Sequence, residues 1–254
     1  EAGVLLDEPT FTAAAIGAAE LLASVHTTGE GKLLRTSRVG RASANAGVLE
    51  DYGCVAEAYL AVLGVTGDAV WLQRARALLD RVMGEFGDPD GGFFDTSADA
   101  ESLVVRPKDV SDNASPSGVS SVTHALISFA AITGESAYLD AAESGLASSA
   151  GVARQAPRFA GWTLAAAEAL QSGPLEIAIV GRGAGKDELH RAALKNAPGG
   201  AVVIAGEAGL DIPLFEGRDE VAGKPTAYVC QGFVCQRPMT TVDELRDLFS
   251  SRPF

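Results

Sequence analysis

A pattern that recurs three times along the chain constrains its fold more than any other feature. Each copy has an acidic residue, an aromatic residue three positions later and then an alanine-containing run, and the copies begin at Glu8, Asp68 and Glu135. Thr-Gly precedes the second and third copies. Glycine favours the end of one helix, and an acid favours the positive dipole at the start of the next. The copies recur after 60 and 67 residues, which predicts stacked α-helical hairpins.

Apolar residues with the 3.6-residue period of a helix predict six helices, or three hairpins. The expected helices cover about residues 10–25, 45–63, 69–86, 117–132, 137–148 and 154–170. The stripe of the second helix is Val48, Leu49, Tyr52, Val55, Ala56, Tyr59, Leu60 and Leu63, and that of the third is Trp71, Ala75, Leu78, Leu79, Val82 and Phe86. These stripes should form the core of a mainly helical unit.

The residue pattern of the sequence changes after Gly173. Short β-branched runs at residues 175–180, 201–204 and 227–230 predict strands, and the segments near residues 186–197 and 241–250 predict helices. We therefore expect two units, a helical one over residues 1–172 and a small α/β one over residues 173–254.

The chain is strongly acidic, which excludes some partners. Its 254 residues carry a net charge of −13, and Lys and Arg form no cluster. Because phosphate backbones and anionic lipids attract clustered cations, we expect neither nucleic acid nor a membrane as partner. The apolar runs are also too short and too interrupted to span a bilayer.

Cysteine use and the first residue lead to two further expectations. Three sparse cysteines fit a reducing compartment better than a disulfide framework, and no signal peptide is evident, so we expect a cytoplasmic protein. The chain opens on Glu1 rather than on a methionine. It is therefore expected to be a fragment, or a processed or trimmed product.

Two motifs in the last 80 residues resemble ligand-binding sites but lack residues that such sites require. Gly181–Lys186 lies between a predicted strand and a helix, yet Val180 and Asp187 stand where a phosphate-binding loop needs Gly and Ser or Thr. Cys230 and Cys235 have no nearby zinc ligands to join them. Cys230 fits a small buried hydrophobe on a strand, with a labile thiol pair as the alternative. We expect no metal and no cofactor.

The segment from residue 88 to residue 118 is too long for an ordinary connection between helices. Its two β-like runs, at residues 93–96 and 103–105, predict a hairpin, and Asn113, Ser115 or Ser117 should cap the helix that follows. Long loops on rigid scaffolds often carry binding groups. Alternatively, the cations of this loop, Arg106 and Lys108, simply pair with the neighbouring acids Asp95, Asp109 and Asp112.

One side of the predicted helix 117–132 is lined by small hydroxyls and an imidazole. The residues are Ser117, Ser121, His124 and Ser128, with Ser120 beside them and no Lys or Glu. Such a face suits a confined, water-containing space. The alternative is that these side chains pack against another helix with their hydrogen bonds made within the protein.

Five stretches, taken together, resemble a known family. They are Leu49-Glu50-Asp51-Tyr52, Thr66-Gly67-Asp68 with Trp71-Leu72, Gly91-Gly92-Phe93-Phe94-Asp95-Thr96, Val105-Arg106-Pro107-Lys108 and Asp112-Asn113-Ala114-Ser115-Pro116-Ser117-Gly118. In this order they resemble the C-terminal half of the thioredoxin-domain-containing, or spermatogenesis-associated protein 20-like, family. The resemblance covers most of residues 45–140 and extends more loosely to residues 227–235.

The resemblance implies an architecture. Members join a thioredoxin-like domain to an α/α toroid of six hairpins, the fold of N-acylglucosamine 2-epimerases and six-hairpin glycosidases. The three hairpins of this chain would be about half of such a toroid, followed by the α/β tail. The thioredoxin-like domain and the early, His-rich barrel helices have no counterpart here, which implies a truncated chain or a partner copy that supplies the remainder.

Two hypotheses of function follow from the resemblance. The first is a carbohydrate-binding or sugar-isomerising or -epimerising protein. Epimerases of this fold use histidines as acid and base, and inverting hydrolases use paired carboxylates. The expected catalytic residues are His124, Asp95 and Asp51. The expected substrate-binding residues are Tyr52, Phe94, Arg106, Lys108, Asp112 and Ser117.

The second hypothesis is a non-enzymatic helical scaffold that docks a thioredoxin-like domain in a redox or interaction role. The two hypotheses differ in what they require of one face of the molecule. If His124 and Asp95 converge on one concave pocket, the first is favoured. If their face is buried against another chain or domain, the second is favoured.

Overall fold

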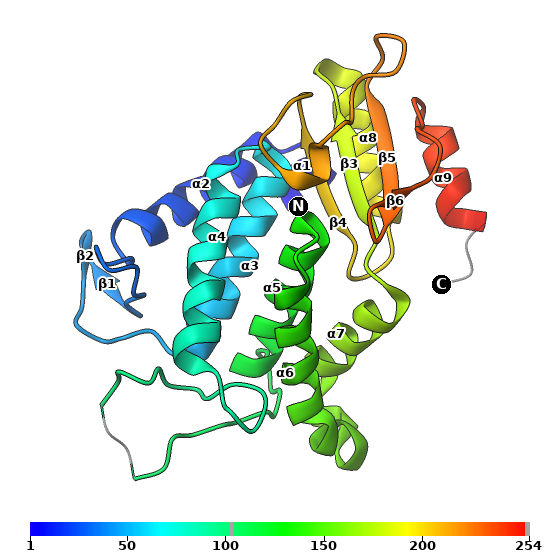
Figure 1. The fold of residues 1–254 in the computed structure, drawn as a ribbon. Helices are drawn as coiled ribbons and strands as arrows, with labels where there is room; N and C mark the ends of the chain where they lie inside the picture. Colours follow the sequence, from blue (N-terminus) through cyan, green and yellow to red (C-terminus); the bar gives the residue numbers. More distant parts are fainter. Residues whose placement is uncertain (102–103, 252–254) are drawn as a thin grey trace.

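The structure is a computed structural model that describes residues 1–101 and 104–251. Two helices form its centre: α3 (Leu49–Thr66) and α5 (Gly118–Thr133), which pack along each other. α4 (Val70–Arg81) and α6 (Ser136–Gln155) cover them, and α2 (Pro9–Ser24) and α7 (Gly161–Ser172) flank this group (Figure 1). The short helix α1 (Ala2–Leu5) and the two-residue strands β1 (Ser37–Arg38) and β2 (Arg41–Ala42) complete the helical part.

The predicted apolar stripes form the core. In α3, seven of the eight stripe residues are buried, and Val48, which precedes the helix, is half-buried. All six stripe residues from Trp71 to Phe86 are buried, although the last turns, at Val82–Phe86, form a π-helix. The mainly helical fold class is therefore confirmed.

The helix joints also follow the sequence. Gly67 and Gly134 end α3 and α5 with φ of 65° and 76°, the left-handed conformation that favours glycine. Asp68 accepts a hydrogen bond from the backbone N of Val70 at 3.0 Å, as an acid at a helix start should. Glu135 instead forms an ion pair with Arg76 on α4. The joint between α5 and α6 therefore also contacts the neighbouring hairpin of α3 and α4.

α3 and α5 approach each other closely at one glycine. A Cβ on Gly53 would lie 2.4 Å from Ser121 Oγ and 2.6 Å from the backbone N of Val122. No side chain fits there without a shift of α5. Ser121 is therefore buried in a helix contact, so this part of the hydroxyl stripe packs rather than lining a space.

The C-terminal part is a four-stranded sheet with two helices. Its order is β4 (Val202–Gly206), β3 (Glu176–Val180), β5 (Thr226–Gln231) and β6 (Val234–Cys235), and only β3 and β4 are parallel. One face packs on α8 (Gly183–Asn196) and α9 (Val242–Ser251). Residues of the other face, such as Ala178 and Ile204, join the helical core, and β4 contacts α3 (Figure 1).

Three expectations are wrong or changed. The helix predicted at 154–170 does not exist as such, because α6 runs to Gln155 and Pro157, which has no N–H, starts a 3-10 turn at Pro157–Phe159 before α7. The predicted hairpin is also wrong for the described residues: Phe93 pairs with Gly87 in an isolated bridge, and Val104 is exposed and not in a strand. Leu103 lies outside the described residues.

The third change concerns the cysteines. Cys230 and Cys235 face each other on β5 and β6 and form a disulfide. Cys230 is fully buried, as predicted, but as half of a cross-link rather than as a free hydrophobe. In the described part of the chain, no helix is both long and apolar enough to cross a membrane.

Candidate functional site

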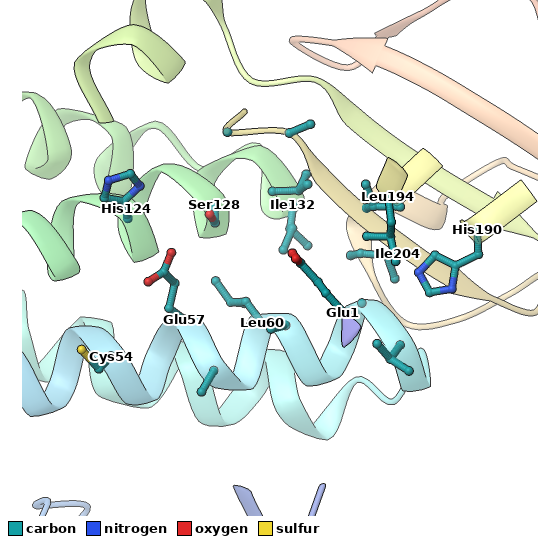
Figure 2. Close-up of a pocket in the computed structure, with 18 residues that line it drawn as sticks. Glu1, Cys54, Glu57, Leu60, His124, Ser128, Ile132, His190, Leu194 and Ile204 are labelled. Atoms are coloured by element: carbon teal, nitrogen blue, oxygen red, sulfur yellow. The ribbon is translucent and has the colours of Figure 1, made fainter. Parts of the chain in front are cut away.

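A cavity of about 590 Å³ lies where α3, α5, β4 and α8 meet (Figure 2). α3 contributes the polar residues Cys54 and Glu57, and α5 contributes His124 and Ser128. β4 and the segment before it provide an apolar wall, including Val202 and Ile204. We call this space the α3–α5 cavity.

Helical spacing explains which side chains reach the cavity. Cys54, Glu57, Ala58 and Ala61 follow the i, i+3, i+4, i+7 spacing of one face of α3, and His124 and Ser128 are four residues apart on α5. Alanines on the α3 face leave room beside the carboxylate. An open space therefore lies at the His124–Ser128 end of the hydroxyl stripe, whereas Ser120 and Ser121 are buried.

Glu57 and His124 lie on neighbouring helices and face the same space (Figure 2). Loss of hydration raises the pKa of the Glu57 carboxyl, whereas His124 lowers it by charge attraction and Glu1 raises it by repulsion. A carboxyl with a raised pKa exchanges protons closer to neutrality, which suits a general acid or base.

The tautomer of His124 follows from one contact. Its Nε2 lies 2.9 Å from the carbonyl O of Trp162, and the Trp162 ring packs edge-on at 6.1 Å. A carbonyl oxygen only accepts hydrogen bonds, so Nε2 must carry the proton. In the neutral imidazole, Nδ1 is then an unprotonated nitrogen that can act as a base.

His190 on α8 lines the far end of the cavity (Figure 2). It is only 4% exposed, and its Nε2 has no hydrogen-bond partner among the described residues. Burial, with a smaller contribution from Lys186, lowers the pKa of His190 to about 4. His190 is therefore neutral at physiological pH, with one polar atom that the protein leaves unsatisfied.

Asp51 and Tyr52 have structural contacts rather than a place in the cavity. Asp51 Oδ2 accepts a hydrogen bond from the backbone N of Val48 at 2.8 Å and pairs with Arg35 Nε at 2.9 Å. Tyr52 is buried against Phe86, and its hydroxyl accepts from the backbone N of Leu33 at 3.0 Å. These contacts fix the N-terminus of α3 and the chain that precedes it.

The cations of the long loop are also engaged. The Arg106 guanidinium lies 4.0 Å from the centre of the Phe94 ring and donates to the carbonyl oxygens of Glu85 and Thr96. Lys108 pairs with Asp88 at 2.9 Å and donates to the carbonyl of Gly91. Both residues therefore hold the loop closed, and the acid that pairs with Lys108 is not one of those expected.

Asp112 and Ser117 cap helices. Ser117 Oγ accepts from the backbone N of Ser120, which makes Ser117 the N-cap of α5, one of the three caps expected. Buried Asp112 accepts from the backbone N of Ser117 and also from those of Trp162 and Thr163 at the start of α7.

Asp95 lies in a different space from His124. It lines a recess of about 250 Å³ at the N-termini of α3 and α5, together with Glu50, Asp109 and Ser117. Burial raises the pKa of Asp95, although the backbone N of Asp109 donates to it at 2.9 Å. The structure therefore does not bring His124 and Asp95 into one pocket, which was the arrangement expected of the first hypothesis.

Three cavity residues were missed at the sequence level: Cys54, Glu57 and His190. The available signal was the small-residue face of α3, where Glu57 stands among Cys54, Ala58 and Ala61. Burial raises the pKa of the Cys54 thiol, followed in effect by nearby carboxylates such as Glu50 and Glu57. Within the described residues, no group of His, Cys, Asp and Glu is arranged to hold a metal ion.

Comparison with known proteins gives one consistent relative. The chain is similar to spermatogenesis-associated protein 20. It is 28% identical to the human protein over 216 residues, or 80% of this chain, and 27% identical to the mouse protein over the same length. The rat protein is 27% identical over 266 residues, or 96% of this chain. The chain spans about a quarter to a third of the length of these relatives, and no protein-family model matches it.

Proposed function

We propose that the α3–α5 cavity binds a neutral, sugar-like carbonyl compound and moves a proton at the carbon beside its carbonyl, as in isomerisation or epimerisation. The observation that carries this proposal is the pair Glu57 and His124, two proton-transfer groups on neighbouring helices that line one cavity. Burial raises the pKa of Glu57, and His124 Nε2 donates to the carbonyl O of Trp162, an arrangement that in a neutral imidazole leaves Nδ1 as the acceptor.

The chemistry assigns complementary roles. His124 Nδ1 removes the proton from the substrate carbon, and the Glu57 carboxyl protonates the carbonyl oxygen or returns a proton to the opposite face of the carbon. The Ser128 hydroxyl, which lines the cavity, is a hydrogen-bonding group for a substrate hydroxyl. These roles replace Asp95 and Asp51 in the catalytic set expected from sequence and keep His124.

The lining also selects the substrate class. Glu1 and Glu57 line the cavity, and no Lys or Arg of the described chain does. Because an anionic group would meet these two carboxylates and no Lys or Arg side chain, phosphorylated and acidic sugars are disfavoured. A neutral polyhydroxy compound, such as an N-acylated amino sugar, fits better.

The same proposal includes the fold of the larger protein. The antiparallel helices α3 to α6 are the repeating unit that an α/α toroid requires, and the chain spans only part of its relatives. We infer that this chain forms about half of such a toroid. The remaining hairpins would then enclose the open side of the α3–α5 cavity.

A binding titration tests the site. N-acetylglucosamine and N-acetylmannosamine are titrated into the protein while backbone amide resonances are followed. We expect perturbations at residues 54–61 of α3 and 124–128 of α5, and weaker binding in Glu57→Gln and His124→Gln. Glu143→Gln, an exposed acid on α6, is the matched control. Perturbations confined to other parts of the chain would refute this site.

A second function is favoured by a separate observation. Apolar side chains of α2 and α7 are exposed, with Phe11 at 51% and Trp162 at 47%, and exposed apolar side chains on each of these helices are contacts that a partner domain would cover. In this alternative the chain is a non-enzymatic scaffold, and a thioredoxin-like domain of the full-length relative docks on these helices.

This alternative has its own test. Adding a separately produced thioredoxin-like domain should shift the fluorescence of Trp162, and Phe11→Glu should weaken the complex. Glu57→Gln should leave the complex unchanged. If the domain binds with equal affinity to Phe11→Glu and to the unchanged protein, or does not bind, the scaffold function on this surface is rejected.

A further inference from the structure

The disulfide between Cys230 and Cys235 lies against a buried cation. Nη2 of Arg218 lies 3.4 Å from Cys230 Sγ and 3.1 Å from Cys235 Sγ. Arg218 is 8% exposed, and its Nη1 donates to the carbonyl of Leu214. Its Nε has no partner among the described residues. A guanidinium with spare donor capacity is thus held beside both sulfurs, although a neutral disulfide gains little from a positive charge.

The surroundings of Arg218 supply only partial charge compensation. The carboxyl of Glu176 attracts Arg218, but this carboxyl is itself buried and accepts a hydrogen bond from the backbone N of Phe233 at 2.8 Å. Burial lowers the pKa of Arg218, and Glu176 and Tyr228 oppose that effect. If one of the two sulfurs became a thiolate, the positive charge of Arg218, which is only partly compensated in the oxidised protein, would stabilise it.

The two sulfurs differ in access. Cys230 on β5 is fully buried, whereas Cys235 on β6 is exposed. An incoming thiolate can therefore reach Cys235 Sγ, and the leaving group is then Cys230 Sγ beside Arg218. Leaving thiolates of lower pKa depart faster, and an adjacent cation lowers the pKa of a thiol.

We propose that Cys230 and Cys235 form a thiol–disulfide exchange site that accepts electrons from a dithiol, with Arg218 as the group that stabilises the departing thiolate. The dithiol's thiolate attacks Cys235 Sγ, a new S–S bond forms, and the Cys230–Cys235 bond breaks with its electron pair on Cys230. The second thiol of the reductant loses its proton and attacks the mixed disulfide. Cys235 leaves and takes up a proton, so two electrons have passed to the protein and the dithiol is oxidised to a disulfide.

The turn between β5 and β6 is anchored independently of the disulfide. The backbone N of Phe233 is bonded to Glu176, and the Phe233 ring packs on Gly134 at the end of α5, where a Cβ would lie 3.1 Å from the ring. The reduced protein should therefore keep its fold. The cross-link can open and close as a reaction site rather than only as a structural bond.

Thiol labelling with mass spectrometry gives the first test. Air-oxidised protein should react at one cysteine, the free Cys54, and dithiothreitol should expose two more while the far-UV circular dichroism stays unchanged. Glutathione should form its mixed disulfide on Cys235 and not on Cys230. Three labelled cysteines in folded, air-oxidised protein, or a mixed disulfide on Cys230, would overturn the proposal.

The role of Arg218 is tested by the rate of reduction with dithiothreitol. Arg218→Gln should slow the reaction about 3- to 10-fold, and Arg218→Lys, which keeps the charge, should restore most of the rate. Arg237→Gln, which changes an exposed arginine in the segment after β6, is the control and should react like the unchanged protein. Equal rates in folded Arg218→Gln and unchanged protein would refute the role of Arg218. If Arg218→Gln does not fold, the mixed-disulfide measurement on the unchanged protein still decides the exchange site.

Discussion

The carboxylate of Asp112 joins the starts of two helices, since its Oδ1 accepts from the backbone N of Ser117 at 2.9 Å while its Oδ2 accepts from that of Thr163 at 3.0 Å. α5 and α7 are thereby held at a fixed distance by one side chain. α7 supplies Trp162, whose carbonyl fixes the tautomer of His124. Asp112 therefore acts on the candidate site through position, not through contact with a substrate.

Asp112→Ala should destabilise the protein by about 2–4 kcal/mol, because it leaves several buried helix-end amides without an acceptor. Asp109→Ala, which removes one exposed contact to Ser111, should cost less than about 1 kcal/mol. Urea unfolding monitored by circular dichroism measures both. Equal losses in the two variants would contradict the capping role of Asp112.

The contribution of Asp112 should also depend on pH. Burial alone would raise its pKa, but the amides of Ser117, Thr163 and Trp162 and the hydroxyl of Ser120 outweigh burial and lower it. A carboxyl with a depressed folded pKa stabilises the protein above its unfolded pKa, about 3.9, and loses that contribution as pH falls through the folded value. The stability difference between unchanged protein and Asp112→Asn should therefore shrink below about pH 4.

His190 should make the protein sensitive to mild acid. Its folded pKa is about 4 because of burial, and the unfolded chain titrates near 6.5, so the unfolded state binds a proton first as pH falls. The contribution of neutral His190 to the free energy of unfolding is fully present above about pH 6.5 and is lost progressively as the pH falls toward 4. His190→Leu should remove this loss, measured as the change in Tm between pH 7 and pH 4. The same acid sensitivity in His190→Leu would contradict the assignment.

Gly53 should tolerate no side chain. Gly53→Ala places a methyl group against Ser121 and Val122 of α5 and should cost about 1–3 kcal/mol. Gly17→Ala on α2, where a Cβ meets nothing within 4 Å, is the matched control and should stabilise by about 0.5–1 kcal/mol through helix propensity. Thermal unfolding distinguishes the two. A neutral Gly53→Ala would show that α3 and α5 are less closely packed.

Glu57 should be slightly unfavourable for folding at neutral pH. A raised folded pKa means that the charged form is penalised in the folded protein, and the penalty disappears below the unfolded pKa, about 4.3. Glu57→Gln should therefore raise Tm slightly at pH 7 and not at pH 4. Glu143→Gln should change Tm at neither pH. A lower Tm for Glu57→Gln at pH 7 would show that its charge stabilises the fold.

Local signals predicted most of the helices and strands. The helical period, a glycine at a helix end and a cap such as Ser117 each depend on residues that are only a few positions apart in the sequence. The errors arose where distant residues decide the outcome. Pro157 ends α6, and α7 begins again at Gly161 with the amides of Trp162 and Thr163 bound to Asp112, some 50 residues earlier. Phe93 pairs with Gly87 rather than with the run near Val104, and the periodicity of the sequence contains no information on that choice.

The same limit applies to the site. The pattern of α5 pointed to His124, but nothing in the pattern of α3 singled out Glu57, which lines the same cavity because α3 packs on α5. His190 comes from a helix more than 60 residues after His124 and reaches the cavity only because β4 packs on α3. Acids of the long loop, such as Asp112, were chosen for their chemistry, yet several are helix caps or loop contacts.

Proton exchange at the substrate carbon tests the central proposal most directly. The protein is incubated in D₂O with N-acetylmannosamine, and deuterium at the carbon beside the carbonyl is followed by NMR. We predict incorporation that depends on the protein, is lost in both Glu57→Gln and His124→Gln, and persists in Glu143→Gln. Incorporation that survives both cavity variants, or no incorporation by folded protein that binds the sugar, would contradict a proton-transfer function for the α3–α5 cavity.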